Sequence, residues 1–231
     1  CRGTLAESCT AFIFVKSLKT AGTSLEAALS NSCSGGDVVT SLGDYEFNRD
    51  ETGAWVHKSM NEGNYQQHDD ALTIRDSLPP EIWSAYFKFS ITRNPWDRAL
   101  SYFFWDKRQD SSLTPPKRVY HNLGVPYDDF TPVKKKFTEF IKSHTLENND
   151  RFYVIDDQLC VDFVVRYEHL DDDSREVCSR LGLSTLQIPR LKAGIRKNKR
   201  HYTEYFDDET RDIVANLHRN DIRLFNYTFG Q

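Results

Sequence analysis

A short apolar run, Ala11–Val15, passes into a polar loop with one glycine, Lys16–Gly22, and then into a helical pattern, Thr23–Leu29. A strand, a loop and an amphipathic helix in direct succession form the building unit of α/β proteins. This unit presents backbone N–H groups at the helix N-terminus, where they can bind an anion. The segment therefore predicts an α/β fold. Its loop fits either an anion site or an ordinary helix start capped by Ser or Thr.

The rest of the chain continues the alternation of strands and helices. Further strands are predicted at Tyr86–Thr92 and Asp162–Tyr167. One helix is predicted at His68–Leu78, where Pro79-Pro80 stops it, and another from Asn94-Pro95 to about Arg108. The remaining predicted helices are Val133–His144, Ser174–Leu181 and Asp207–Leu224. Residues 31–67 and Ser111–Pro132 lack periodicity and are predicted as irregular segments. The alternation indicates a mainly parallel central sheet flanked by helices, with ligands at the carboxyl ends of its strands.

Length and composition fit one globular domain that spans residues 1–231. Hydrophobic residues make up 39% of the chain, and the formal net charge is −4. Because a general nucleic-acid binder is usually basic, we expect no nucleic-acid partner. The longest apolar run, Ala11–Val15, is far too short to span a bilayer. No feature of the sequence indicates an oligomeric state.

The five cysteines are spread without CxxC spacing, so we expect neither a zinc site nor a disulfide framework. Reduced thiols favour a cytoplasmic location. The chain begins at Cys1 instead of Met, so the Golgi lumen, after removal of an N-terminal anchor, is the alternative location.

The first group of residues with chemical potential is the loop KSLKTAGTSLE, Lys16–Glu26. It is not a Walker A motif, because that motif places its lysine after the glycines and here Lys19 precedes Gly22. The physics is similar nevertheless. Gly22 would let the backbone approach a phosphate, Thr23 and Ser24 add hydroxyl donors, and the lysine adds a point charge.

The second group lies in KFSITRNPWDRALSYFFW, Lys88–Trp105. Arg93 ends a strand, and Ser101 lies two turns into the helix that follows, so the two could clamp a second phosphate. The alternative is that Arg93 is structural and that Arg98, which shares a helix face with Ser101, pairs on the surface with one of two neighbouring aspartates, Asp97 or Asp106.

Taken together, these two loops resemble those of sulfotransferases that depend on 3′-phosphoadenosine 5′-phosphosulfate (PAPS). Lys19–Ser24 resembles the 5′-phosphosulfate loop PK[TS]xxT[ST], with Leu18 in place of the proline, and Arg93–Phe104 resembles the 3′-phosphate segment RNPxxRxxSxY. The resemblance is closest to the carbohydrate-sulfotransferase branch and continues through Asp162–Leu170 and Tyr202–Phe229. It implies a P-loop-like sulfotransferase fold.

The resemblance also implies a role for individual residues. Lys19 would contact the 5′-phosphosulfate and its bridging oxygen. The residues that would wrap the 5′-phosphate are Thr20, Ala21, Gly22, Thr23 and Ser24. Arg93 and Ser101 would hold the 3′-phosphate.

The general base is expected to be a histidine, because a hydroxyl acceptor loses a proton as its oxygen attacks sulfur. The spacing in this family favours His68, which precedes Arg93 by a helix and a strand, with Asp69 or Asp70 available to orient it. His57, at a plausible strand end, is the alternative.

A basic run at Arg190–Tyr202 fits either a solvated face or a loop that folds over the nucleotide, as the family resemblance implies. In the second interpretation Arg196 and Lys197 are candidate cofactor-binding residues. Acidic clusters at Asp171–Asp173 and Asp207–Glu209 lie at predicted helix starts, where they suit the helix dipole better than a metal.

The sequence thus predicts an enzyme that transfers a sulfuryl group from PAPS to a hydroxyl or amine of a carbohydrate or small natural product. The transfer would be an in-line displacement without a metal, in which positioning and charge neutralisation supply the catalysis. Acceptor contacts are expected from residues 31–67 and 109–131. The alternatives are a P-loop kinase or NTPase, and an inert module that binds a nucleotide or a sulfated glycan.

Overall fold

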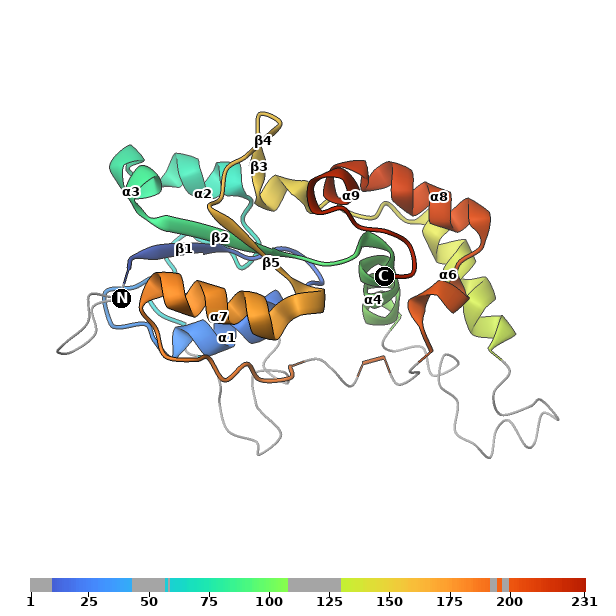
Figure 1. Cartoon of the computed structure of the whole chain (residues 1–231), viewed down its shortest axis with the longest axis horizontal. Coiled ribbons are helices and arrows are strands. Elements are labelled where there is room, and N and C mark those ends of the chain that lie inside the picture. The colour runs from blue at the N-terminus through green and yellow to red at the C-terminus, as the bar shows by residue number, and fades with distance from the viewer. Residues whose placement is uncertain (1–9, 43–56, 58, 108–129, 192–194, 197–199) are drawn as a thin grey trace. The chain divides into compact units, whose positions relative to one another are not determined.

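The computed structural model describes residues 10–42, 57, 59–107, 130–191, 195–196 and 200–231 (Figure 1). These residues form two compact units. The first contains Cys1–Arg93 and Asn149–Lys192, and the second contains Asn94–Asn148 and Ala193–Gln231.

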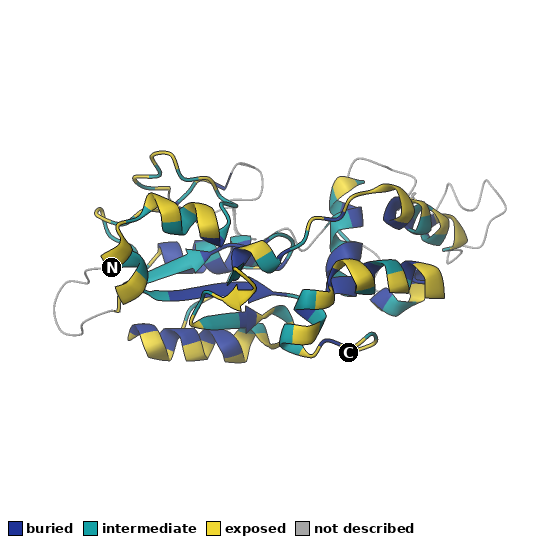
Figure 2. Cartoon of the chain, turned by 90° about the horizontal axis from the view of Figure 1, so that it is seen from above, coloured by how far each residue is buried: buried dark blue, intermediate teal, exposed yellow. Residues whose placement is uncertain are grey.

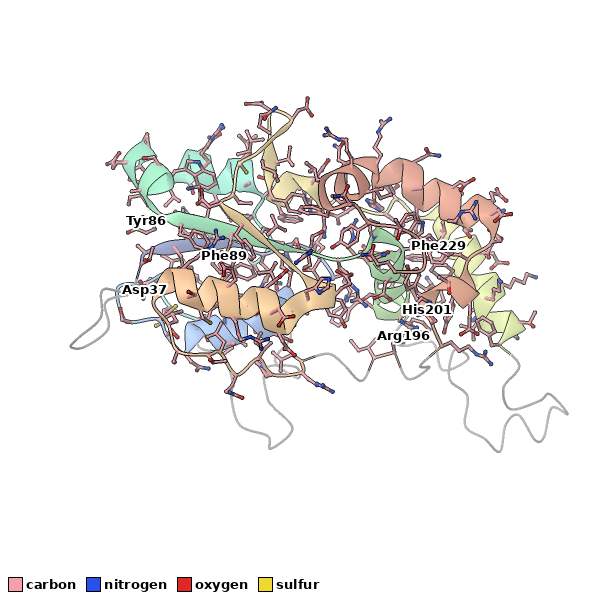
Figure 3. The ribbon with its side chains drawn as sticks, viewed as in Figure 1. Asp37, Tyr86, Phe89, Arg196, His201 and Phe229 are labelled. Carbon is pink, nitrogen blue, oxygen red and sulfur yellow. The ribbon has the colours of Figure 1, made fainter. Side chains whose placement is uncertain are left out.

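The first unit is built on a three-stranded parallel sheet. Its strands are β1 (Phe12–Val15), β2 (Phe87–Thr92) and β5 (Phe163–Arg166), in the spatial order β1-β2-β5. Phe14 lies opposite Phe89 (labelled in Figure 3) in the register of β1 and β2. Their rings stack with centroids 5.0 Å apart. The predicted parallel sheet flanked by helices is therefore confirmed, and all three strands end at the same edge of the sheet.

Helices cover both faces of this sheet. One face carries α1 (Gly22–Ser30) and α7 (Leu170–Leu181), and the other carries α2 (Ala71–Ser77) and α3 (Pro80–Ala85) (Figure 1). The connection between β2 and β5 also contains a short antiparallel hairpin, β3 (Val154–Ile155) and β4 (Gln158–Leu159). The core between the sheet and its helices is formed by Leu25, Leu29, Phe89, Ile91, Val165, Val177 and Leu181.

Two predictions in this unit need correction. Pro79-Pro80 does end α2, but Pro80 also begins α3, because proline is tolerated at the first helical position where no N–H partner is needed. Helix α7 begins at Leu170, four residues before the predicted start, because Asp171–Asp173 form its first turn and complement the helix dipole.

The second unit is helical. It consists of α4 (Pro95–Asp106), α6 (Thr131–Ser143), the 3₁₀ turn η5 (Tyr202–Tyr205), α8 (Asp208–Leu217) and α9 (Arg219–Phe225). Its core is aromatic, with edge-to-face pairs such as Phe103 with Phe137 and Phe206 with Phe229. Figure 2 shows the alternation of buried and exposed positions that amphipathic helices produce.

The predicted helix Asp207–Leu224 is two helices, α8 and α9, which are separated at His218. The imidazole of His218 is buried, and its Nδ1 lies 3.0 Å from Arg98 Nη2. Arg98 is only 5% exposed and also donates to the carbonyl of Glu147 at 3.2 Å. The interpretation of Arg98 as a surface partner of Asp97 or Asp106 is therefore wrong: it is a buried cation that ties α4 to the α8–α9 junction.

None of the helices in the described ranges is long and apolar enough to cross a membrane. Among the cysteines that the structure describes, Cys160 and Cys178 are free thiols.

Candidate functional site

The loop between β1 and α1 has an unusual backbone conformation. Lys19 and Ala21 both have positive φ, at 60° and 69°, although neither is glycine. Ala21 is the N-cap of α1, it provides no side-chain cap, and the first turn carries no acidic residue. Among the residues that the structure describes, none accepts a hydrogen bond from the amides of Gly22 and Thr23. The start of α1 therefore offers backbone donors and the positive end of a helix dipole to an anion.

The carbonyl groups of the loop are bound by side chains from outside it. His68 Nδ1 lies 3.0 Å from the carbonyl oxygen of Lys16, Asn149 Nδ2 donates to Leu18 at 2.9 Å, and Arg93 Nη1 donates to Lys19 at 3.3 Å. In a trans peptide the N–H points opposite to the carbonyl. Three side chains on separate segments therefore fix these carbonyl groups, and the amides of the same peptides, those of Ser17, Lys19 and Thr20, point the opposite way.

Two of the predicted phosphate-binding hydroxyls have a structural partner. Thr20 is fully buried, and its Oγ1 lies 2.9 Å from Ser17 Oγ, which in turn donates to the carbonyl of Ile91 in β2. Ser24 Oγ accepts a hydrogen bond of 3.2 Å from the amide of Leu191. The Thr20 hydroxyl is therefore bound within the loop, whereas the Ser24 hydroxyl keeps its proton for donation.

Gly22 has a role that the sequence did not indicate. A Cβ at this position would lie 2.6 Å from Cγ of Lys16, so the glycine makes room for that side chain. Lys16 is only 4% exposed and forms an ion pair with Glu26 on α1. Neither Lys16 nor Glu26 was predicted as a site residue, although a lysine directly after an apolar strand is a signal of an unusual environment.

Arg93 follows β2 at the edge where the strands end. Its guanidinium stacks on the ring of Tyr167 at 4.0 Å from the centroid, which fixes the plane of the arginine beside the loop. Tyr167 follows β5 and was also missed, because no local pattern connects it to Arg93. Ser101, the predicted partner of Arg93 at the 3′-phosphate, is a half-buried residue of α4 in the second unit.

The two candidate histidines have different environments. The Nδ1 atom of His68 faces a carbonyl oxygen, which can only accept, so the neutral ring carries its proton on Nδ1 and has a lone pair on Nε2. His57 is 9% exposed, and its Nε2 has no partner among the described residues. Burial lowers the pKa of His57; Glu26 raises it and Lys16 lowers it further.

The carboxylates beside His68 are engaged elsewhere. Asp70 caps α2 by accepting from the amide of Thr73 at 2.8 Å, and Asp69 accepts from the amide of Gln66 at 2.8 Å. Asp70 therefore acts as a helix cap, and Asp69 accepts a hydrogen bond within a turn. The carbonyl of Lys16 is the group that orients the His68 ring.

The basic run is partly described. Arg196 (labelled in Figure 3) belongs to the second unit. Its Nη1 lies 3.3 Å from the carboxylate of Asp97. Arg200 pairs with Glu204 at 2.8 Å. Lys197 lies outside the described residues. Within the described ranges, no group of three or more His, Cys, Asp or Glu side chains could hold a metal ion.

The chain is similar to known proteins in sequence and in fold. An uncharacterized protein of Archaeoglobus fulgidus is 28% identical over 135 residues, which cover 56% of this chain and 96% of that protein. A crystal structure of a sulfotransferase from Alicyclobacillus acidocaldarius aligns with 97% of this chain and 98% of its own, with 15% identity and a TM-score of 0.35. Residues 13–228 match the sequence profile of the sulfotransferase family, so the match includes both loops and nearly the whole chain. The chain therefore belongs to the sulfotransferase family.

Proposed function

We propose that this member of the sulfotransferase family uses PAPS as its donor and sulfates a hydroxyl or amine of a carbohydrate or small natural product. The observation that carries the proposal is the start of α1. There, backbone amides without a described acceptor follow a loop whose carbonyl groups are bound to the scaffold. Amides held in place at the positive end of a helix dipole suit a phosphate dianion, because little reorganisation is needed when the anion arrives.

In the proposed reaction the acceptor oxygen attacks sulfur as the bond between sulfur and the bridging oxygen breaks. The electron pair of that bond goes to the bridging oxygen, which leaves as part of the 5′-phosphate of 3′,5′-adenosine bisphosphate (PAP). The ammonium group of Lys19 neutralises the charge that develops there, a task that a metal ion performs in most phosphoryl transfers. The residues proposed to contact the 5′-phosphate are Thr20, Ala21, Gly22, Thr23 and Ser24.

His68 is proposed as the general base. Its Nδ1–H is directed at the carbonyl of Lys16, so its Nε2 is the atom with a lone pair for the acceptor proton. This carbonyl belongs to Lys16, the first residue of the loop between β1 and α1. One peptide group therefore links the proposed base to the loop that is proposed to bind the 5′-phosphate. His57 is the weaker candidate, because its Nε2 is buried away from any acceptor that approaches through solvent.

The 3′-phosphate is proposed to bind Arg93 and Ser101, with Arg196 and Lys197 closing over the nucleotide. Arg93 is held in plane by Tyr167, which suits bidentate contact with a phosphate. Arg196 would have to exchange its partner Asp97 for the ligand. The carbohydrate branch, the acceptor class and the cytoplasmic location likewise belong to the proposal.

Calorimetric titration with PAP and with AMP tests the nucleotide assignment. The loss of one charge-assisted clamp costs about 1.5–3 kcal/mol, so we expect PAP to bind roughly ten- to hundredfold more tightly than AMP. Arg93→Ala should remove most of that difference. Equal affinity of the unaltered protein for the two nucleotides would show that Arg93 and Ser101 do not form a 3′-phosphate site.

Turnover tests the chemical step. Lys19→Ala should leave PAP binding nearly intact, because PAP carries no sulfate, while sulfuryl transfer from PAPS collapses. Transfer by the unaltered protein should persist in EDTA. A strict requirement for Mg²⁺ together with ATP hydrolysis would instead favour a kinase or NTPase, and PAP binding without any transfer would favour an inert module.

A further inference from the structure

Lys16 is the first residue of the loop, directly after β1, and its side chain is 3% exposed. Its ammonium group forms an ion pair with Glu26, whose side chain is 12% exposed. Burial lowers the pKa of Lys16, while Glu26 opposes the shift through its charge and a hydrogen bond. A buried lysine is tolerated only when such a partner compensates for lost hydration, so the two residues depend on each other.

The path of the Lys16 side chain crosses the beginning of α1. A Cβ on Gly22 would lie 2.6 Å from Cγ and 3.4 Å from Cδ of Lys16, so the methylene groups of the lysine rest directly on the backbone of the first helical residue. Glu26 lies four residues further along the same helix, one turn away and on the same face. The side chain therefore spans from the end of the strand, past Gly22, to the second turn of α1.

Both ends of this connection are fixed by further hydrogen bonds. Oε1 of Glu26 accepts from Thr40 Oγ1 at 2.9 Å, while Oε2 binds Lys16. The carbonyl oxygen of Lys16 lies 3.0 Å from Nδ1 of His68. The residue thus contacts α1 through its side chain and the proposed base through its main chain.

We propose that Lys16 and Glu26 are a positioning pair that sets the spacing between the loop and the start of α1, and thereby shapes the cradle for the 5′-phosphate without touching the nucleotide. This inference rests on the proposed function of the loop. The two left-handed non-glycine residues, Lys19 and Ala21, store strain that the surrounding contacts must hold. A buried ion pair is often no more stabilising than an apolar pair of similar shape, so stability alone does not explain Lys16 and Glu26. What their ion pair adds is a directional contact between the end of β1 and α1.

The test uses Lys16→Met, Glu26→Gln and the double variant in the full chain. Methionine keeps methylene groups against Gly22, and the double variant leaves no buried charge without a partner. Each single change should lower Tm by about 5–15 °C, and the double variant should recover most of that loss. Calorimetry then compares PAP with 3′-AMP, which lacks the 5′-phosphate. In the double variant the affinity for PAP should fall about tenfold or more, while that for 3′-AMP stays unchanged.

Lys88→Met is the matched control. Lys88 is also buried and ion-paired, with Asp162 at 3.1 Å, but it lies near the start of β2, at the opposite end of the strands from the loop. This variant should retain the ratio of PAP to 3′-AMP affinity. If the double variant of Lys16 and Glu26 recovers stability and also keeps the wild-type ratio of PAP to 3′-AMP affinity, the positioning role is overturned. The proposed function is not affected by that result. A wild-type protein that binds neither nucleotide would overturn the proposed function, and the inference with it.

Discussion

Replacing Gly22 with alanine tests the geometry of the loop with a single methyl group. The new Cβ would lie 2.6 Å from Cγ of Lys16, whereas carbon atoms in contact are about 3.5–4.0 Å apart. Gly22 does not have a positive φ, so the backbone itself tolerates alanine and gains up to about 1 kcal/mol of helix propensity. The close contact between the new Cβ and Lys16 therefore decides whether the substitution lowers stability.

Relief of the collision requires Lys16 to move, and that movement weakens its ion pair with Glu26. Overpacking of this kind costs about 1–3 kcal/mol, which in a chain of 231 residues lowers Tm by about 2–12 °C. Urea denaturation and calorimetric titration with PAP measure the two consequences, lower stability and weaker binding. Gly35→Ala is the control, because a Cβ there meets nothing within 4 Å.

A double-mutant cycle separates this explanation from a direct effect of the methyl group on ligand approach. In a Lys16→Ala/Glu26→Gln background the atom that Cβ would strike is absent, so Gly22→Ala should become neutral or slightly stabilising. An equal loss of stability in both backgrounds would refute the packing argument. Equal stability with lost PAP affinity would show that the methyl group blocks the phosphate itself.

Three further outcomes follow from other parts of the structure. His68→Ala should retain PAP binding and lower the transfer rate by about 10²–10⁴-fold, with His57→Ala as the less affected control in the same rate assay. Ala21→Gly should be neutral or stabilise by up to about 1 kcal/mol in urea denaturation, because φ is 69° there. Burial and the charge of Arg98 lower the pKa of His218 from 6.5 to about 3. His218 therefore stays neutral in the folded state, whereas in the unfolded chain it takes up a proton as the pH falls below 6.5. The free energy of unfolding should therefore fall by about 2 kcal/mol by pH 5. His218→Gln should remove this part of the pH dependence, and His57, whose pKa is also lowered by burial, should account for part of the remaining slope.

The strands could be predicted from sequence because their signals are local. Apolar runs marked β1, β2 and β5 to within one residue at each end. Helix boundaries were harder. Pro80 reads as a stop signal and is also a good first residue of a helix, and the local pattern does not decide between the two.

Two of the contacts that support the loop and Arg93 could not be predicted, because their partners are distant in the sequence. Asn149 reaches the carbonyl of Leu18 across 131 positions, and Tyr167 supports Arg93 from the end of a different strand. Such contacts depend on strand order, which no local pattern contains. Gly22 shows a subtler difficulty: its spacing suggested approach of a phosphate, whereas its nearest neighbour is the side chain of Lys16.

Not every polar residue of the sequence motif at Arg93–Phe104 is a candidate for binding phosphate. Asn94 caps α4 at the amide of Trp96 and donates to the carbonyl of Thr228 at 3.0 Å. Trp96 Nε1 donates to the carbonyl of Arg211 at 2.9 Å, and Arg98 is buried against His218. Most of the polar residues that carry the family resemblance here therefore bind other parts of the helical unit.

It follows that lost activity in a variant of this segment does not by itself identify a phosphate ligand. A change at Arg98 leaves the carboxylate of Asp221, which is fully buried, without the guanidinium 3.8 Å away, so it should act through folding. Only Arg93 and Ser101 remain as candidates for direct contact, and the ratio of PAP to AMP affinity in a folded variant distinguishes them from their neighbours. Stability and nucleotide discrimination must be measured on the same protein, because in this segment the two effects come from adjacent residues.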